Sequence, residues 1–288
     1  MIDYSFQRYL SAKRTVDDRA LNAHVWQGLR NTLRTVPSVP LQVLEIGAGI
    51  GTMIDRALEW RLFDETIHSQ VVYTALDEQE DNVIVAQQKF HTRPDWLSLR
   101  LEHADLFAFA ERPEEANRYD LLIAHAFLDL MDIPQTLPLL KTLLSPGGLV
   151  YFTINFDGAT ILQPEIHRDF DQQIETLYHR TMDERITGGQ LSGDSQSGRH
   201  LFGHLREAGI EVLAAGSSDW VVFGNRSGYP ADEAYFLHYI IHTMQGALHQ
   251  HPQLDQARFE TWIKQRHQQV EAGDLVYIAH QIDFLGTL

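Results

Sequence analysis

The chain has 288 residues, of which 44% are hydrophobic and 22% charged, and 39 acidic residues against 23 basic ones give it a formal net charge of −16. The composition is that of a globular protein, and the length fits one large α/β domain with insertions or two small domains. The negative charge argues against nucleic acids and anionic membranes as partners, because phosphate binding needs clustered positive charge, although an acidic surface also keeps a protein in solution.

Other classes of protein are disfavoured as well. The chain contains no cysteine, which excludes disulfides and thiolate zinc sites. Its first residues, "MIDYSFQRYLSAKR", are too polar for a signal peptide. No apolar run approaches the ~18 residues that a membrane span requires. We therefore expect a soluble, cytoplasmic protein.

The first 36 residues are expected to be mainly helical. Thr15 is placed to cap a helix whose apolar residues recur at helical spacing. These residues are Val16, Leu21, Val25, Trp26, Leu29 and Leu33. The prolines of "VPSVP", residues 36–40, are expected to end this helical region.

Short apolar strands then alternate with helical patterns. The strands are expected at 41–46, 71–77, 97–103, 119–126 and 148–156, and the helices near 50–61, 79–91 and 135–144. Such alternation predicts a parallel sheet with right-handed crossovers.

The second half of the chain is less regular. A helix is expected near 164–185, followed by a polar loop, "TGGQLSGDSQSG", and a short helix in "GRHLFGHLREAG". A strand region then covers 210–224, two helices cover about 231–249 and 254–271, and an apolar strand lies within 274–286. The two late strands are expected to pair antiparallel.

The stretch "VLEIGAGIGT", residues 43–52, joins the first strand to the next helix through closely spaced glycines. Gly47, Gly49 and Gly51 let the backbone turn sharply, and the N–H groups that open the helix then face an approaching ligand. Glu45 lies just ahead of them. Thr52 stands where the dinucleotide fingerprint would have a further glycine, so the loop alone leaves the nucleotide open.

Acidic residues follow the next two strands. The second strand ends in Asp77, with Glu78 beside it, and an acid at this place is suited to hydrogen-bond the hydroxyls of a ribose. In "HADLF", residues 103–107, Asp105 is suited to accept a hydrogen bond from the amine of an adenine. A tight turn, "SPGG", precedes the fifth strand.

In these four elements, taken in this order, the chain resembles the class I S-adenosylmethionine-dependent methyltransferases. The resemblance covers about 41–155 and, more loosely, 197 to the end. It implies a Rossmann-like α/β fold with a seven-stranded, mostly parallel sheet whose last strand is antiparallel, and S-adenosylmethionine as cofactor. The residues that it implies for the cofactor are Glu45, Gly47, Ala48, Gly49, Gly51, Asp77, Glu78, Asp105, Leu106 and His125.

Compared with that family, a single domain over 1–288 carries added segments: an N-terminal helical cap, 1–36, and two helical insertions, 157–196 and 226–272. The resemblance places them over the carboxyl ends of the strands, where ligands bind in open α/β sheets. Long insertions there usually form lids or binding walls. Alternatively, they enlarge the core or form the contact of a homodimer.

The end of the fourth strand, in "YDLLIAHAFLDLMD", carries the candidates for proton transfer. His125 lies at the carboxyl end of that strand, and Asp129 follows four residues later. A histidine titrates near neutral pH and can take a proton from a hydroxyl or an amine. Alternatively, the ring of His125 only packs in the cofactor pocket, since alignment of nucleophile and methyl group can supply much of the rate.

Residues in the added segments are candidates for binding. Leading helices in this family fold over the cofactor, so Arg19 or Lys13 could meet its carboxylate, although the same residues could form a solvated helix face. The candidates for substrate binding are Tyr9, Tyr178, His179 and Arg199. An arginine can bind a carboxylate bidentately, and exposed surface charge is the alternative.

No metal is expected. His200 with His204, and His238 with His242, are spaced four residues apart, but neither pair belongs to an H-E-x-x-H pattern. Methyl transfer from a sulfonium does not require a metal.

The sequence thus predicts a methyltransferase that acts on an oxygen or nitrogen atom of a small molecule. The acidic charge and the lack of any Pro-Pro pair, which the motif "NPPY" of amino-group methylation contains, argue against nucleic-acid and protein-glutamine substrates. Two alternatives stay open. The glycine loop and Asp77 would also suit an NAD(P)-dependent oxidoreductase, and a non-catalytic module could bind S-adenosylmethionine without turnover.

Overall fold

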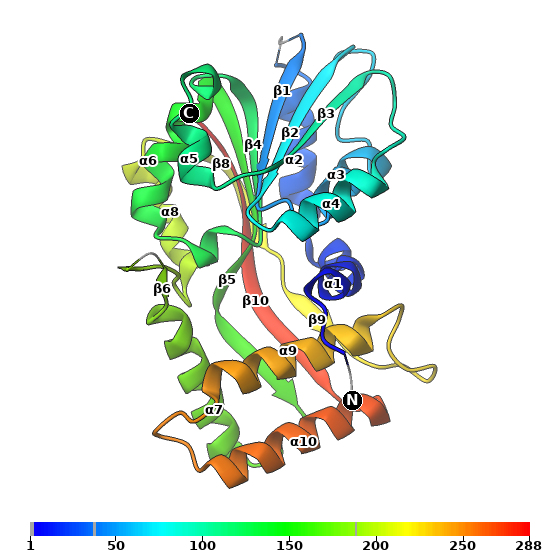
Figure 1. Ribbon diagram of the computed structural model, residues 1–288, viewed down its shortest axis with the longest axis vertical. Helices are drawn as coiled ribbons and strands as arrows, with labels where there is room; N and C mark the ends of the chain where they lie inside the picture. Colours follow the sequence, from blue (N-terminus) through cyan, green and yellow to red (C-terminus); the bar gives the residue numbers. More distant parts are fainter. Residues whose placement is uncertain (1–2, 37–38, 188) are drawn as a thin grey trace.

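In the computed structural model, which describes residues 3–36, 39–187 and 189–288, one mixed sheet runs the length of the molecule (Figure 1). Its strands follow the order β3-β2-β1-β4-β5-β10-β8, and β9 pairs with the first part of β10. Their bounds are β1 Leu41–Ile46, β2 Val71–Asp77, β3 Leu97–His103, β4 Tyr119–His125, β5 Leu144–Gln163, β8 Glu211–Ser217, β9 Trp220–Val222 and β10 Val276–Thr287. The first five strands are parallel, whereas β10 is antiparallel to β5, β8 and β9.

This topology confirms the expected mostly parallel sheet with an antiparallel last strand. An eighth strand arises because the region 210–224 divides into β8 and β9. Between them the N–H of Ser218 donates to the carbonyl of Gln281 on β10, at 2.9 Å. Both short strands therefore pair with different parts of the same long strand.

Helices cover both faces of the parallel part of the sheet. The helices are α1 Phe6–Ala20, α2 Ala23–Leu33, α3 Thr52–Glu59, α4 Glu80–Lys89, α5 Leu106–Ala110, α6 Ile133–Leu143, α7 Arg168–Asp183, α8 Ser197–Glu207, α9 Glu233–Leu248 and α10 Gln256–Ala272. Side chains alternate along each strand, so Val43 packs with α2 and α3 on one face while Leu44 packs with α5, α6 and α8 on the other. Burial on both faces explains why these strands are almost wholly apolar.

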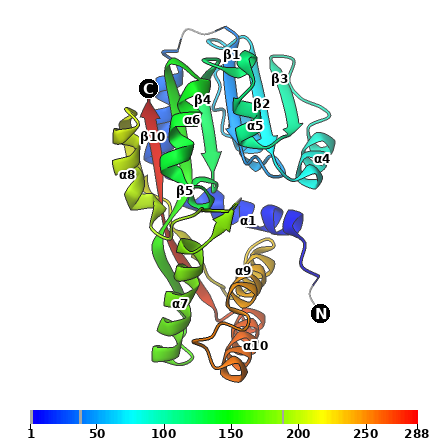
Figure 2. The ribbon, with the colours of Figure 1, turned by 60° about the vertical axis from the view of Figure 1, so that its left-hand side comes forward.

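A second lobe forms where β5 and β10 extend past the other strands. Their far ends pair with each other, from Val276 with Gln163 onwards. Helices α7, α9 and α10 pack on this extension and form the lower part of the molecule (Figures 1 and 2). The segments 157–196 and 226–272 thus supply most of this lobe, and helix α1 lies where the two lobes meet.

The N-terminal region differs from the expectation of one helix capped by Thr15. Ser5 caps α1 and Asn22 caps α2, where the Asn22 side chain accepts hydrogen bonds from the N–H groups of His24 and Val25 at 3.1 Å. Thr15 lies inside α1, and its hydroxyl donates to Glu233 at 2.7 Å. The chain breaks between the helices because the N–H of Asn22 donates to buried Asp283.

Other boundaries differ for similar reasons. Strand β5 extends well beyond the expected 148–156, because β10 pairs with it along almost its whole length. The loop after α7 contains a short hairpin of β6 Ile186–Thr187 and β7 Gln190–Leu191. The expected break at 36–40 and the expected loop at 187–198 fall partly on 37–38 and 188, which lie outside the described residues.

Candidate functional site

A cavity of about 320 Å³ opens where β1, β2 and β4 end. This volume is within the range of small-molecule sites, roughly 300–1,000 Å³. Helix α1 forms one wall through Phe6, Leu10, Lys13 and Asp17. The predicted cofactor residues that line the cavity are Glu45, Gly47, Ala48, Gly49, Asp77, Glu78, Asp105, Leu106 and His125.

The glycine loop turns tightly beneath this cavity. Gly47 has φ +64°, and a Cβ there would lie 2.3 Å from the ring of Phe127, so no larger residue fits. Gly51 caps α3 with φ +79° and faces Phe90 instead, outside the cavity lining. Gly51 therefore turns the chain at the start of α3, whereas Gly47 and Gly49 lie next to the cavity.

Asp77 holds the loop in position. Its carboxylate accepts hydrogen bonds from the N–H of Gly49 at 2.7 Å, the N–H of Gln79 at 2.9 Å and the side-chain amide of Asn82 at 3.0 Å. It also lines the cavity beside Glu78. The acid predicted to bind a ribose thus joins the end of β2 to the glycine loop.

Glu45 lies at the end of β1, and Asp105 follows β3, on the other side of β2. The hydroxyl of Tyr73 donates to Glu45 at 2.7 Å, and burial raises the pKa of Glu45 to about 8. Asp105 caps α5 by accepting a hydrogen bond from the N–H of Ala108 at 2.9 Å. Both carboxyl groups face the cavity from the edge at which parallel strands present their ligand sites.

His125 is buried and bonded through both ring nitrogens. Nε2 lies 2.9 Å from Asp17 Oδ2, and Nδ1 lies 2.8 Å from the hydroxyl of Thr153. Burial lowers the pKa of His125 to about 4, against the opposing effect of Asp17. The ring is therefore neutral at pH 7, with Nε2 donating to Asp17 and Nδ1 accepting from Thr153.

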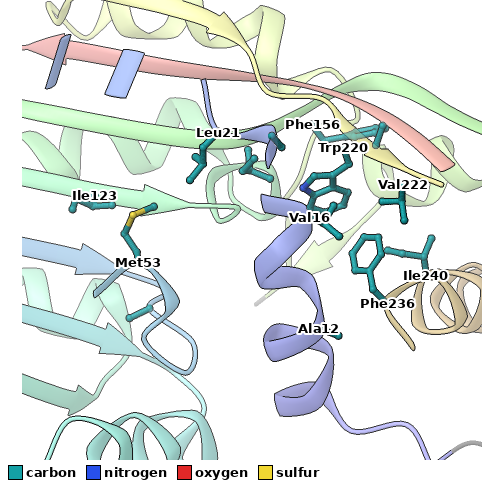
Figure 3. Packing of buried hydrophobic residues seen from close by; sticks show 14 of the residues in the cluster. Ala12, Val16, Leu21, Met53, Ile123, Phe156, Trp220, Val222, Phe236 and Ile240 are labelled. Atoms are coloured by element: carbon teal, nitrogen blue, oxygen red, sulfur yellow. The ribbon is translucent and has the colours of Figure 1, made fainter. Parts of the chain in front are cut away.

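Asp17 is the centre of a buried cluster of charges between α1, α3 and β9. Its carboxylate lies 3.2 Å from Lys13 Nζ and 3.5 Å from Arg56 Nη2, and it accepts a hydrogen bond from the indole of Trp220 at 2.8 Å. Although burial opposes ionisation, Lys13, His125 and Arg56 hold the pKa of Asp17 below its usual range. The indole of Trp220 lies against α1 near Val16 (Figure 3).

Sequence reasoning missed this cluster. Asp17 and its partner Trp220 are 203 positions apart, and no local pattern joins them. For Arg56, the sequence does contain an indication of burial. It stands among Met53, Ile54 and Ala57 on a helix that packs against the sheet, where a buried cation needs a buried anion.

Arg19 and Lys13, the two predicted contacts of a cofactor carboxylate, lie in different places. Lys13 lines the cavity. Arg19 points to the other lobe and forms a bidentate ion pair with buried Glu233, with Nη2–Oε2 at 2.8 Å. Lys13 is thus the cation of α1 that the structure brings to the site, whereas Arg19 fastens α1 to α9.

The predicted substrate residues divide into two groups. Tyr9 and Tyr178 lie close enough together for the charge of Tyr178 to raise the pKa of Tyr9. His179 instead bonds Thr160 at 2.9 Å, and half-exposed Arg199 pairs with Asp157 at 2.8 Å. None of these four residues lines the cavity.

Asp129 lies in the 3₁₀ turn η2, Leu128–Leu130, directly after the residues of β4 that face the cavity. Its Oδ1 is buried and has no hydrogen-bond partner. Burial raises the pKa of Asp129, and Arg185 and Lys13 oppose that effect.

The described residues contain neither a metal site nor a membrane-spanning helix. No group of three or more His, Cys, Asp or Glu side chains there has the arrangement of a metal site. In the same part of the chain, no helix combines the length and the apolar character needed to cross a membrane.

The chain is similar to known proteins at the level of structure. No family model matches it, and no curated protein matches it either. The solved structure of a "putative methyltransferase" from Bacillus halodurans superposes with a TM-score of 0.52 at 11% identity, over 92% of this chain and 99% of that one. A cyclopropane synthase from Mycobacterium tuberculosis gives a TM-score of 0.48 at 12% identity, over 99% of each chain. From the strand order and the first of these likenesses, the chain has a Rossmann-like α/β fold, shared with that putative methyltransferase.

Proposed function

We propose that the protein is an S-adenosylmethionine-dependent methyltransferase that acts on an oxygen or nitrogen atom of a small molecule. The observation that carries the proposal is the cavity at the ends of β1, β2 and β4, which brings the glycine loop, Asp77 and Asp105 to one place. The net charge of −16 supports a small-molecule acceptor over a nucleic acid.

The residues in the cavity fit such a cofactor. Carboxylates of Asp77 and Glu78 can accept hydrogen bonds from ribose hydroxyls, and Asp105 and Leu106 can meet the adenine. The turn at Gly47 and the helix that starts after Gly51 offer backbone N–H groups to a carboxylate. When bound, the cofactor supplies an electrophilic methyl group on a sulfonium.

The charges of the cavity suit a ligand with both signs of charge. The carboxylates of Asp17 and Asp77 face the space that a sulfonium and an ammonium would occupy, and Lys13, which pairs with Asp17 at 3.2 Å, is a cation of the cavity lining. The protein's part in the reaction is to align the acceptor with the methyl group and to exclude water.

We propose His125 as a positioning residue. Both of its nitrogens are engaged, so no lone pair is left for a proton of the acceptor. Its bond to Asp17 instead fixes the inner end of α1 over the cavity. Changing His125 to Ala is expected to lower turnover and to leave cofactor affinity within about threefold.

The test is calorimetric titration of the protein with S-adenosylmethionine, S-adenosylhomocysteine, NAD and NADP in parallel. Micromolar binding of the first two alone is expected. Binding of a nicotinamide nucleotide alone would contradict the proposal in favour of an oxidoreductase. Binding without methyl transfer to any small amine or alcohol would favour a non-catalytic module.

A variant at Asp77 ties the titration to this cavity. Asp77→Ala removes the carboxylate from the end of β2, and we expect S-adenosylhomocysteine affinity to fall at least about tenfold. The matched control is Asp95→Ala, at an exposed position ahead of β3, which should leave affinity unchanged. An unchanged affinity of folded Asp77→Ala would place the nucleotide elsewhere.

A further inference from the structure

Two buried polar atoms beside the cavity lack partners. Nη1 of Arg185 and Oδ1 of Asp129 are both inaccessible to solvent and have no hydrogen bond. Arg185 Nη1 and the main chain of Asp129 meet at Gly193, where a Cβ would lie 3.3 Å from Arg185 Nη1 and 3.2 Å from the carbonyl oxygen of Asp129. An unpaired buried charge is destabilising, so such atoms mark a place where a ligand supplies the missing partners.

Three tyrosines from separate elements are connected with these residues through Tyr178, which interacts electrostatically with both Arg185 and Asp129. Tyr9 lies on α1, Tyr178 on α7 and Tyr277 on β10, and among the described residues none of their hydroxyls has a hydrogen bond. Burial raises the pKa of each phenol, to about 12 for Tyr178, and a charge on Tyr178 would raise the pKa of the other two further. The three phenols are therefore within electrostatic range of one another.

These five residues, which we call the acceptor cluster, do not themselves line the candidate cofactor cavity, but Gly193, between Arg185 and Asp129, donates its N–H to the carbonyl of cavity-lining Met131 at 3.1 Å. Asp129 precedes Leu130, Arg185 stands two positions before Thr187, and Tyr9 lies one helical turn before Lys13. Leu130, Thr187 and Lys13 all line the cavity. The acceptor cluster is thus on the side of α1, η2 and α7, whereas Asp77 and Asp105 lie at the ends of β2 and β3.

We propose that the acceptor cluster, Tyr9, Asp129, Tyr178, Arg185 and Tyr277, binds the methyl acceptor as a small amine that also carries a carboxylate. The inference rests on the function proposed above. Arg185 pairs with the carboxylate, Asp129 holds the ammonium, and the faces and hydroxyls of the phenols surround the nitrogen. A neutral acceptor would leave Arg185 Nη1 and Asp129 Oδ1 without partners, which disfavours it.

The reaction transfers one proton and one methyl group. The ammonium gives one proton to Asp129, whose pKa is raised by burial. The lone pair of the freed nitrogen forms a bond to the methyl carbon, and the electron pair of the C–S bond passes to sulfur. The products are the methylated ammonium and S-adenosylhomocysteine, and Asp129 returns its proton to water.

The experiment measures ternary binding by calorimetry at saturating S-adenosylhomocysteine. The probes are glycine, β-alanine and 4-aminobutyrate, which span different separations of charge, and their single-group analogues ethylamine, propylamine, acetate and propionate. We expect at least one amino acid to bind tenfold or more tightly than every analogue. Equal or weaker binding of all the amino acids would overturn the inference.

Variants assign the binding to the acceptor cluster. Arg185→Gln and Asp129→Asn should each weaken amino-acid binding at least tenfold and leave S-adenosylhomocysteine binding unchanged. Arg180→Gln is the control, since exposed Arg180, on α7 five positions before Arg185, bonds Gln253 at 2.9 Å. Tyr178→Phe removes one hydroxyl at little risk to folding and should weaken amino-acid binding at least threefold.

The outcomes distinguish failure of the acceptor cluster from failure of the proposed function. Unchanged amino-acid binding by folded Arg185→Gln and Tyr178→Phe would overturn the acceptor cluster and leave the proposed methyltransferase standing. Failure of the unaltered protein to bind S-adenosylhomocysteine would overturn the proposed function, and this inference with it.

Discussion

At the scale of the residue, Glu45 makes stability depend on pH. Its folded pKa of about 8 exceeds its usual value of 4.5, because the carboxyl is buried beside Tyr73. The folded state therefore holds a proton that the unfolded state loses, and this stabilisation is complete below about pH 4.5 and disappears as the pH rises through 8.

Glu45→Gln keeps an acceptor for Tyr73 and removes the ionisation. We expect the Tm of this variant relative to the unaltered protein to be at least ~3 °C higher at pH 8.5 than at pH 5, measured by circular dichroism. Glu260→Gln, at an exposed position on α10, should show no such difference between the two pH values. The same relative Tm for Glu45→Gln at both would mean that Glu45 is ionised throughout.

Asp17 provides a second test at this scale. Asp17→Asn leaves Lys13 and Arg56 buried without their shared anion, which should lower the free energy of unfolding by about 3 kcal/mol. Asp18 is the matched control, because it bonds the same Arg56 from the adjacent position but is 27% exposed. Urea denaturation should show Asp18→Asn to be clearly less destabilising, and equal losses would contradict the central place of Asp17.

At the scale of the element, α1 is held to α9 by interactions along its whole length. Arg19 and Thr15 both bond Glu233, and the ring of Tyr9 stacks on Tyr239 with centroids 4.2 Å apart. Because Glu233 is fully buried and serves two donors, Glu233→Gln should weaken this attachment more than any change at the exposed Arg8–Asp232 pair.

Hydrogen exchange measures that difference. We expect amides of α1 to exchange at least about fivefold faster in Glu233→Gln, while those of α2 stay unchanged. Asp232→Asn should alter α1 little. Unchanged exchange of α1 in both variants would show that its contacts with α3, and not those with α9, hold it in place.

Elements differ in how far the sequence predicts them, and the reason is physical. Strands β1 and β2 match their expected ranges because a strand buried on both faces is a largely apolar run between polar turns, whereas the edge strand β3 matches through its alternation of apolar and polar residues. The length of β5 comes from its pairing with β10, and the break between α1 and α2 comes from Asp283. Those partners are more than a hundred positions away, beyond any local pattern.

The residues of the site divide in the same way, into those that the local sequence predicts and those that depend on distant partners. The glycine loop, Asp77 and Asp105 were found because each stands at the end of a strand, and parallel strands bring their ends to one edge. Arg19 and Lys13 have the same local appearance on α1, and only the position of α9 separates them. Asp17 is important because it pairs with Arg56, and Arg185 because one of its nitrogens is buried without a hydrogen-bond partner. Both features exist only in the folded chain.

At the scale of the whole molecule, α1 links the two lobes. It pairs with α3 through Arg14 and Glu59, and with α9 through Arg19 and Glu233 (Figure 1). It also forms one wall of the cavity. A ligand bound in that cavity to the folded state alone stabilises it by about 2.7 kcal/mol at a concentration of 100 times Kd. The stabilisation should spread to the elements that contact the ligand.

We therefore expect S-adenosylhomocysteine to slow amide exchange in α1 as well as in the glycine loop and the start of α4, and to leave α10 unaffected. Helix α10 serves as the internal control, because it lies at the far end of the lower lobe (Figure 2). Protection of the sheet edge alone, without α1, would show that the cofactor lies beneath an independent helix. Protection of α1 would make the N-terminal segment the element through which cofactor binding reaches the acceptor cluster.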